Sequence, residues 1–459
     1  MNTSFYYNFL LICIFVYSCN PKFEKDYNTL SEKSIFLNQI INDSLNSYTY
    51  FVPSYYDTNK VWPVIFFFDP QAKGEIPLKK YKKLGENYGY ILIGSNKSRN
   101  GMNEQEQLAV FRNIKLSVKN MFSIHVSRIY TAGFSGGARV SSGIAINEGG
   151  INGVIACGAG FPQVNKPIKN QFHFISLVGI KDFNYPELVL LHKNLDNIKM
   201  RNEFISFEGN HEWPGEEIME KAFLWLEINA MRDNIKSKDD SIIDLIEKDF
   251  NIQIEKARSS FEKFTIAIKA VSYLNGIKDI TCFNSIIDSL QNSEIVQETL
   301  ASEINNMNNE IIEHQSYMEN LSLKDFYWWK KEITRLKNIE LKSRDYESLK
   351  TCRTLNYISL LMFMNANSAI NQNNTVQAKE VLELYEIADP ENPDVYYLYS
   401  LYFATLKDTL SAEKYLNIAI TKGFDDSVRL FSEKKMNILG STDTYKSFIN
   451  NKNNDILLK

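Results

Sequence analysis

Between about residues 47 and 231, short apolar runs alternate with segments in which apolar residues recur every three or four positions. Runs of this length that are rich in Ile, Val and Phe are typical of strands buried on both faces of a parallel sheet. Their alternation with helical segments predicts an α/β sheet with helices covering both faces. The runs are SYTYFV from Ser47, VIFFFD from Val64, YILIGS from Tyr90, RIYTAGF from Arg128, GVIACG from Gly153, FHFISLVG from Phe172 and FISFEG from Phe204.

Helical patterns fill three of the intervals between these runs. Residues 138–146 are compatible with a helix, and a further helix is expected near Pro214, because proline is favoured in the first turn. Ile218, Ala222 and Trp225 would lie on one face of that helix. The third helix places its apolar residues on one face at Leu108, Phe111, Ile114, Val118 and Met121.

Beyond about Asn234 the strand-like runs disappear, and the sequence predicts an all-helical region. An internal repeat of 34 residues follows the tetratricopeptide pattern, with small residues where paired helices approach closely. Two ordinary helical hairpins of coincidental spacing are the alternative interpretation. The matched positions are Met362 with Tyr396, Ala366 with Ser400, Ala369 with Phe403, Ala378 with Ala412, Leu382 with Leu416, and Pro390 with Phe424.

The amino-terminal nineteen residues have the pattern of an export signal. Residues 9–16 form an uncharged apolar run that is too short to span a bilayer but suits the core of a signal peptide. The run leads into VYSC at residues 16–19, which resembles a bacterial lipobox and predicts a lipid anchor on Cys19. A cleaved secretory signal with an incidental cysteine is the alternative, because residues 1–8 contain no Lys or Arg.

Composition and charge exclude several classes of protein. The formal net charge is only −4 and no basic stripe is present, so nucleic acid binding is not expected. The spacing of the five cysteines fits neither a disulfide framework nor a zinc site, and no metal or organic cofactor is indicated. We interpret Cys157, Cys282 and Cys352 as buried thiols.

A serine between glycines is the strongest candidate for chemistry. Ser135, in GFSGG at residues 133–137, follows a predicted buried strand and precedes a predicted helix. This is the setting of a nucleophile elbow, a strained turn whose neighbouring positions must be small. The pentapeptide alone is a weak signal, because glycine-rich turns around serine are common.

A nucleophilic serine needs a base, and the chain has five histidines. His211 alone follows a predicted strand in a loop at the same sheet edge as the serine. Asp182 follows the preceding strand in the same way and could orient the imidazole. The chain order Ser135, Asp182, His211 is that of the α/β-hydrolase triad.

These motifs together resemble the α/β-hydrolase superfamily over roughly residues 45–231. The likeness is to its small esterases, which include polyhydroxybutyrate depolymerase-like and feruloyl esterase-like proteins. In that branch the histidine often stands in a Gly-x-His-x-Trp-Pro setting, matched here at 209–214. The expected segments are a lipoprotein signal at 1–18, a tether at 19–44, a catalytic domain at 45–233, a helical region at 234–355 and tetratricopeptide-like repeats at 356–459.

The resemblance implies an acyl-enzyme mechanism on an ester substrate, with Ser135 as nucleophile and His211 as acid and base. One oxyanion donor would be the N–H of Gly136, and the second should come from the loop at 69–74. Pro70 has no N–H, so Gln71 is our candidate for that donor. No role is assigned to Arg99, which would border the pocket.

The leading hypothesis is an exported lipoprotein esterase whose helical repeats bind a protein partner. The alternative from another functional class is a binding protein, in which the hydrolase fold is retained as a catalytically silent scaffold and the repeats bind a partner. A serine peptidase is a third possibility, since the same triad serves both reactions. The partners expected are therefore an ester substrate, a protein on the repeats and a membrane of the cell envelope reached through Cys19.

Overall fold

The computed structural model describes residues 38–40, 47–163, 168–340 and 345–448. The predicted signal peptide, Cys19 and most of the predicted tether lie outside these residues. The chain divides into two compact units, Met1–Asn309 and Glu310–Lys459, and the division falls within one long helix. Among the described residues, no helix combines the length and the apolar character that a membrane crossing requires.

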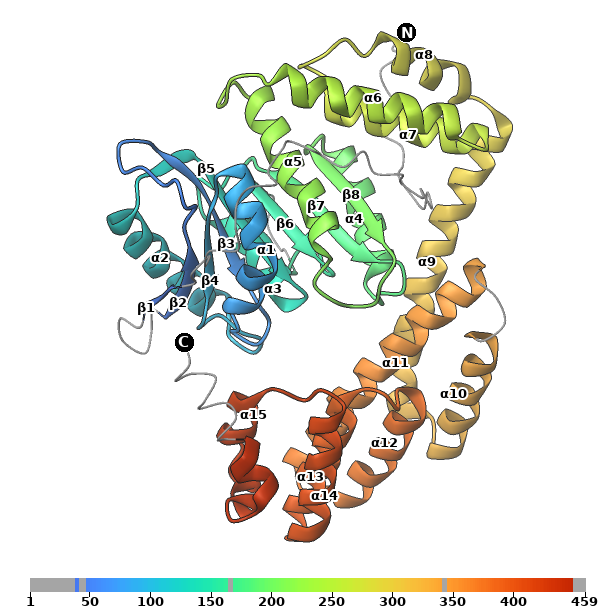
Figure 1. Cartoon of the computed structure of the whole chain (residues 1–459). Coiled ribbons are helices and arrows are strands. Elements are labelled where there is room, and N and C mark those ends of the chain that lie inside the picture. Colours follow the sequence, from blue (N-terminus) through green and yellow to red (C-terminus); the bar gives the residue numbers. More distant parts are fainter. Residues whose placement is uncertain (1–37, 41–46, 164–167, 341–344, 449–459) are drawn as a thin grey trace. The chain divides into compact units, whose positions relative to one another are not determined.

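An eight-stranded sheet organises the first unit (Figure 1). Its spatial order is β1-β2-β4-β3-β5-β6-β7-β8. The pairs β1–β2 and β2–β4 are antiparallel, and every other neighbouring pair is parallel. The strands are β1 (Asn38–Ile40), β2 (Tyr48–Phe51), β3 (Trp62–Phe68), β4 (Ile91–Ser95), β5 (Ile124–Phe134), β6 (Gly153–Cys157), β7 (His173–Gly179) and β8 (Asn202–Phe207).

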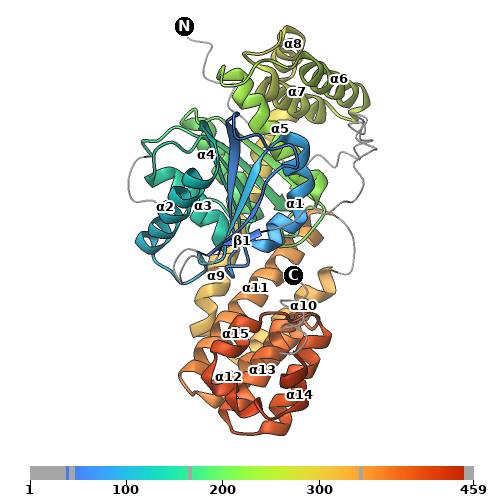
Figure 2. The same cartoon turned by 60° about the vertical axis from the view of Figure 1, so that its left-hand side comes forward.

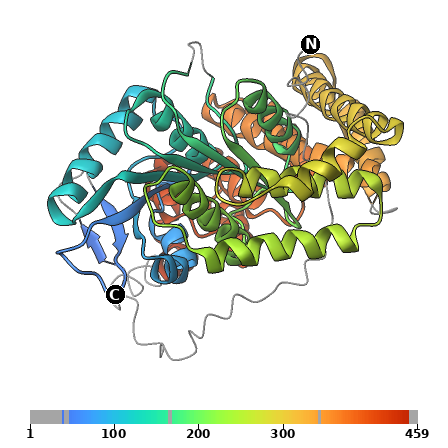
Figure 3. The ribbon, with the colours of Figure 1, turned by 90° about the horizontal axis from the view of Figure 1, so that it is seen from above.

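Helices cover both faces of this sheet, as the alternating sequence pattern predicted. Helices α1 and α5 lie on one face, and α2, α3 and α4 lie on the other (Figure 3). The central strands are buried on both sides, and all seven residues of β3 are buried. The helices are α1 (Glu75–Tyr88), α2 (Glu104–Met121), α3 (Gly136–Asn147), α4 (Tyr185–Asn197) and α5 (Glu216–Arg232). The arrangement confirms the predicted α/β-hydrolase fold.

Details of the predicted elements were wrong at three places. Met121 is 43% exposed because it ends α2, and Phe122 packs instead against Tyr50 and Tyr56. Pro214 lies before α5 rather than in its first turn, since the helix begins at Glu216. The short edge strand β1 was not predicted, because three residues carry too little pattern.

Three further helices, α6 (Asp240–Lys256), α7 (Ser260–Leu274) and α8 (Thr281–Leu290), follow the sheet in the first unit (Figure 2). Helix α7 is attached to α5 by an edge-on contact between the rings of Tyr273 and Trp225, 5.1 Å apart. Arg232 of α5 also donates hydrogen bonds to carbonyl oxygens of α7.

Cys282, predicted to be buried, is exposed near the start of α8, whereas Cys157 and Cys352 are buried as predicted.

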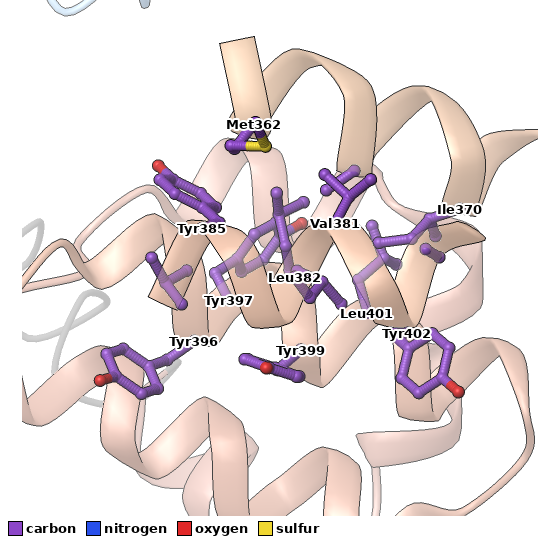
Figure 4. Packing of buried hydrophobic residues seen from close by; sticks show 14 of the residues in the cluster. Met362, Ile370, Val381, Leu382, Tyr385, Tyr396, Tyr397, Tyr399, Leu401 and Tyr402 are labelled. Atoms are coloured by element: carbon purple, nitrogen blue, oxygen red, sulfur yellow. The ribbon is translucent and has the colours of Figure 1, made fainter. Parts of the chain in front are cut away.

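The second unit is entirely helical in its described residues, which confirms the predicted all-helical remainder. Paired helices α11 with α12 and α13 with α14 enclose an apolar core (Figure 4). Helix α12 begins at Thr375 and α14 begins 34 residues later, at Thr409. The elements are α9 (Glu294–Leu323, shared with the first unit), α10 (Phe326–Glu340), α11 (Tyr346–Asn371), α12 (Thr375–Ala388), α13 (Pro393–Thr405), α14 (Thr409–Thr421), α15 (Ser427–Ser432) and a 3₁₀ helix, η1 (Lys434–Leu439).

The small residues predicted at the helix crossings lie in this core. Ala366, Ala378 and Ala412 have no exposed surface, and Ser400 is equally buried. The Ser400 hydroxyl donates a 2.7 Å hydrogen bond to the carbonyl oxygen of Ala412, so the second helix pair is close enough for a side chain to reach the facing backbone. These positions fit a close-packed helical repeat, and the assignment to the tetratricopeptide class stays a prediction.

Candidate active site

Ser135 stands on a strained turn between β5 and α3. The strand ends at Phe134 and the helix begins at Gly136, so Ser135 is the single residue that joins them. Its backbone has φ 52° and ψ −120°, a conformation that costs a non-glycine residue about 1–3 kcal/mol. The N–H of Ser135 donates a 2.8 Å hydrogen bond to the carbonyl oxygen of Cys157 at the end of β6, which holds the turn in place.

The glycines around Ser135 are required by close backbone contacts. A Cβ on Gly133 would overlap with the carbonyl group of Gly137, because the helix folds back over the end of the strand. A Cβ on Gly137 would overlap with the carbonyl group of Phe68 at the end of β3. The small residues that the sequence placed beside the serine therefore serve the packing of the elbow.

The imidazole of His211 joins Ser135 to Asp182. His211 lies in the loop between β8 and α5, and its Nε2 is 2.8 Å from the Oγ of Ser135. Its Nδ1 is 2.9 Å from Oδ2 of Asp182. With the Nδ1 proton donated to the carboxylate, Nε2 is free to accept the proton of the serine hydroxyl. The structure thus brings together the three residues that the sequence selected from distant loops.

The carboxylate of Asp182 is fully buried and held from both oxygens. Oδ1 accepts a 2.8 Å hydrogen bond from the N–H of Asn184, while Oδ2 faces His211. Burial raises the pKa of Asp182, and the nearby imidazole and the Asn184 N–H oppose that rise. The side-chain amide of Asn184 also donates a hydrogen bond to the carbonyl oxygen of Gly158. This bond ties the turn that carries Asp182 to the end of β6.

Two aromatic rings flank the imidazole. The Phe134 ring centroid lies 4.7 Å from that of His211, and the Phe183 centroid lies 4.4 Å from it. Both rings are tilted toward the imidazole rather than parallel to it. A positive charge that forms on the imidazole would be stabilised by the faces of such rings. Phe134 beside Ser135 and Phe183 beside Asp182 therefore both contribute to the environment of the His211 imidazole.

The two predicted oxyanion donors differ in how the structure places them. Gly136 opens α3, where backbone N–H groups have no partner within the helix. The N–H of Gln71 instead donates a 2.9 Å hydrogen bond to Oδ1 of Asp69. Gln71 pairs with Arg99 in an isolated antiparallel bridge, so the loops after β3 and β4 lie side by side. The role of Gln71 as second donor stays a prediction.

Reasoning from the sequence did not single out three residues of this region as contributors, namely Asp69, Asn100 and Gly158. A Cβ on Gly136 would overlap with the side chain of Asn100, and a Cβ on Gly158 would lie 2.9 Å from Oδ2 of Asp182. Asp69 accepts a 3.1 Å hydrogen bond from Nε1 of Trp213, two positions after His211. Only Asp69 had a local signal, since a charged residue directly ends an otherwise apolar run.

The other four histidines occupy separate environments. His192 is buried and its Nδ1 contacts the side chain of Asn202, while His173 faces Asp233 at 2.6 Å. His125 lies near the start of β5, at the opposite end of the strand from Ser135, and His314 stacks on Tyr357 in α11. In the portion of the chain that the structure describes, no cluster of three His, Cys, Asp or Glu side chains is arranged to hold a metal ion.

No protein-family model and no curated protein matches the sequence. Solved structures resemble part of it: S-formylglutathione hydrolase FrmB from Staphylococcus aureus is 12% identical, with a TM-score of 0.34, over 42% of this chain and 96% of its own. The feruloyl esterase module from Clostridium thermocellum is 14% identical, with a TM-score of 0.33; the match covers 41% of this chain and 85% of the module. A carbohydrate esterase from gut microbiota is 13% identical, with a TM-score of 0.34; the match covers 42% of this chain and 98% of that esterase. Likenesses at these identities and TM-scores support no inference about chemistry. The activity of this chain must therefore be argued from its own side chains.

Proposed function

We propose that the protein is a serine hydrolase that cleaves carboxylic esters through an acyl-enzyme on Ser135. The observation that carries the proposal is the continuous hydrogen-bonded series from Ser135 Oγ through His211 to the buried carboxylate of Asp182. The strained backbone of Ser135 supports it, because strain of this size persists where the surrounding structure holds a functional residue in place.

The proposed reaction has two half-steps. His211 Nε2 takes the proton of Ser135 as Oγ attacks the ester carbonyl carbon, and the resulting imidazolium then gives that proton to the leaving alcohol. Water attacks the acyl-enzyme in the same way and releases the carboxylic acid. Asp182 keeps the ring in the correct tautomer and stabilises its cationic form.

The tetrahedral intermediate carries a negative oxygen that needs hydrogen-bond donors. The N–H of Gly136 is the proposed first donor, since it opens α3 where the helix dipole favours negative charge. The second donor is proposed to come from the loop after β3, with Gln71 as the candidate. Because the N–H of Gln71 already donates to Asp69, it would have to share this hydrogen with the oxyanion.

Labelling with a fluorophosphonate probe tests this proposal. The mature protein should be labelled, and both Ser135→Ala and His211→Ala should lose the label. His125→Ala is the matched control, because this histidine lies at the far end of β5, and it should label like the wild type. A folded wild-type protein that takes no label would refute the enzymatic proposal and favour the scaffold alternative. Hydrolysis of short acyl esters but not of chromogenic peptides would separate the esterase from the peptidase.

We also propose that Cys19 carries a lipid that anchors the protein to a membrane of the cell envelope. The VYSC sequence at 16–19 supports it. Metabolic labelling with an alkyne fatty acid in a bacterial host tests it, with Cys19→Ser losing the label. Cys13→Ser, in the same leader, should retain the label. Retention of the label by Cys19→Ser would refute the anchor.

The repeats are proposed to bind a protein partner. Val376 and Leu410 support this role, because they occupy positions 34 residues apart and are 72% and 83% exposed. The 34-residue spacing places them at equivalent positions of successive helix pairs, and stacked helical repeats form extended surfaces that bind partners. A photo-crosslinking amino acid at position 410 should trap one defined partner in cells, whereas the same probe at Lys379, an exposed polar position of α12, serves as the control. Equal and diffuse crosslinking from both positions would contradict the proposal.

A further inference from the structure

Asp69 is a buried carboxylate at the edge of the active site. It directly follows β3, and only 5% of its surface is exposed. Its Oδ1 accepts the N–H of Gln71 at 2.9 Å and the N–H of Lys73 at 3.4 Å. These bonds fold the segment 69–73 around the carboxylate, and the N–H of Ala72 closes the turn on the carbonyl oxygen of Asp69. The carboxylate therefore shapes the loop that is proposed to supply the second oxyanion donor.

The other oxygen of the same carboxylate holds the loop that carries His211. Asp69 Oδ2 accepts the indole N–H of Trp213 at 3.1 Å, across 144 positions of sequence. Trp213 is 8% exposed, and its ring packs against Phe67, Tyr81 and Phe134 at centroid distances of 6.2, 6.0 and 5.6 Å. A side chain held by three rings and one hydrogen bond has little freedom, so its backbone is fixed as well.

Helix α1 holds the same loop at the two carbonyl groups that follow His211 by two and three positions. Lys80 donates a 2.9 Å hydrogen bond to the carbonyl oxygen of Trp213. The hydroxyl of Tyr81 donates a 2.7 Å hydrogen bond to the carbonyl oxygen of Pro214. These contacts attach the loop that carries His211 to helix α1. Asp69 is the group that joins this loop to the loop at 69–73.

We propose that Asp69 is a positioning residue that couples the placement of His211 to the placement of the oxyanion loop. The inference rests on the proposed serine hydrolase function for its kinetic consequence, but the coupling of the two loops can be observed without catalysis. A base and an oxyanion donor must both be held within about 0.5 Å of their productive positions around the reacting carbonyl. One carboxylate that accepts hydrogen bonds from both loops fixes their separation.

Asp69→Asn is the primary test, because it keeps the shape of the side chain and replaces one acceptor oxygen with an N–H₂ donor. That donor must face either the N–H groups of Gln71 and Lys73 or the indole N–H of Trp213, so one set of bonds is lost. We expect kcat for a short acyl ester to fall by about 10²-fold, the cost of a misplacement of about 1 Å. KM should change by less than about threefold, because Asp69 is buried and both of its carboxylate oxygens already accept hydrogen bonds from the protein.

Trp213→Phe is the partner variant, because it removes the indole donor and retains an aromatic ring. If Asp69 acts through Trp213, the double variant should lose little more activity than Asp69→Asn alone. Asp57→Asn is the control, since this aspartate caps a surface turn between β2 and β3 and should leave kcat unchanged. Losses of the two single variants that multiply in the double variant would overturn the proposal, as would a kcat for Asp69→Asn within twofold of the wild type.

Amide hydrogen exchange tests the coupling independently of activity. Asp69→Asn should accelerate exchange in peptides covering both 69–74 and 208–215, while peptides from β5 and β6 remain protected. Faster exchange confined to 69–74 would overturn the coupling even if the enzyme were active. Faster exchange in both loops of Asp69→Asn, together with a folded wild-type protein that takes no fluorophosphonate label, would instead uphold the coupling and refute the hydrolase function.

Discussion

Gly158 provides a sharp test of the active-site geometry. This residue follows β6 with φ +66°, in the left-handed region that side-chain-bearing residues avoid. A Cβ placed on it would lie 2.9 Å from Oδ2 of Asp182, 3.0 Å from Cε2 of Phe134 and 3.2 Å from Nδ1 of His211. Gly158→Ala therefore inserts a methyl group against the hydrogen bond between Asp182 and His211.

The expected effect has two parts of different origin. The left-handed backbone costs alanine about 1–2 kcal/mol. The methyl group then requires Asp182, His211 or Phe134 to move by several tenths of an ångström, since contacts below about 3.0 Å are not tolerated. A displacement of the base that approaches 1 Å costs about 10²-fold in rate. We expect a kcat at least tenfold below the wild type, with a loss of stability of about 2–3 kcal/mol.

Gly150→Ala is the matched control for this variant. Gly150 has φ +78° in the turn before β6, and no heavy atom lies within 4 Å of an added Cβ. This variant carries the backbone cost without the contact, so it should lose about 1–2 kcal/mol of stability and retain full kcat. Esterase kinetics and urea unfolding of both variants separate the two parts. Equal kcat values for Gly158→Ala and Gly150→Ala would refute the geometry described for the site.

Three further outcomes follow from other parts of the molecule. Ser135→Gly should exceed Ser135→Ala in unfolding free energy by about 1 kcal/mol, because glycine relieves the strain of φ 52°; equal urea midpoints would contradict this strain. Burial raises the pKa of Asp196 to about 7, so its ionisation opposes folding as pH rises from about 4 to about 7. The stability advantage of Asp196→Asn over wild type should therefore grow across that interval and level off above it, whereas an advantage independent of pH would refute the assignment. Arg353→Met should destabilise the helical unit by about 3–5 kcal/mol, because it leaves the buried carboxylate of Glu310 without its bidentate partner; a change in the thermal unfolding free energy below 1 kcal/mol would argue against that pairing.

The central strands and the elbow could be predicted from the sequence because their signals are local. A strand buried on both faces must be apolar at every position, and this is visible in β3 and β6 without knowledge of their neighbours. The elbow needs small residues beside Ser135 for steric reasons that act within five positions. Ser135, Asp182 and His211 could be grouped because parallel strands carry the loops that follow them to one edge of the sheet.

The edge strand β1 and the exposure of Met121 and Cys282 were not predictable in this way. Three residues of β1 form a strand only because β2 offers a free antiparallel edge. Met121 and Phe122 are both apolar and adjacent, and the contacts of Phe122 with Tyr50 and Tyr56 decide which of them is buried. The spacing of apolar residues indicates which face of a helix is buried, but it does not indicate at which residue the helix ends and its burial stops.

The residue types, their order and the apolar runs were sufficient to determine that this chain forms a hydrolase-like sheet with a serine, an aspartate and a histidine at one edge. Only the tertiary structure decided that Asp69 accepts a hydrogen bond from Trp213 and that Gly158 lies against Asp182. Apolar periodicity arises from the burial of each segment separately, so it can be read along the chain. A hydrogen bond or a methyl-sized gap between distant loops depends on strand register and backbone angles to within an ångström, and these are set only when the whole sheet has assembled.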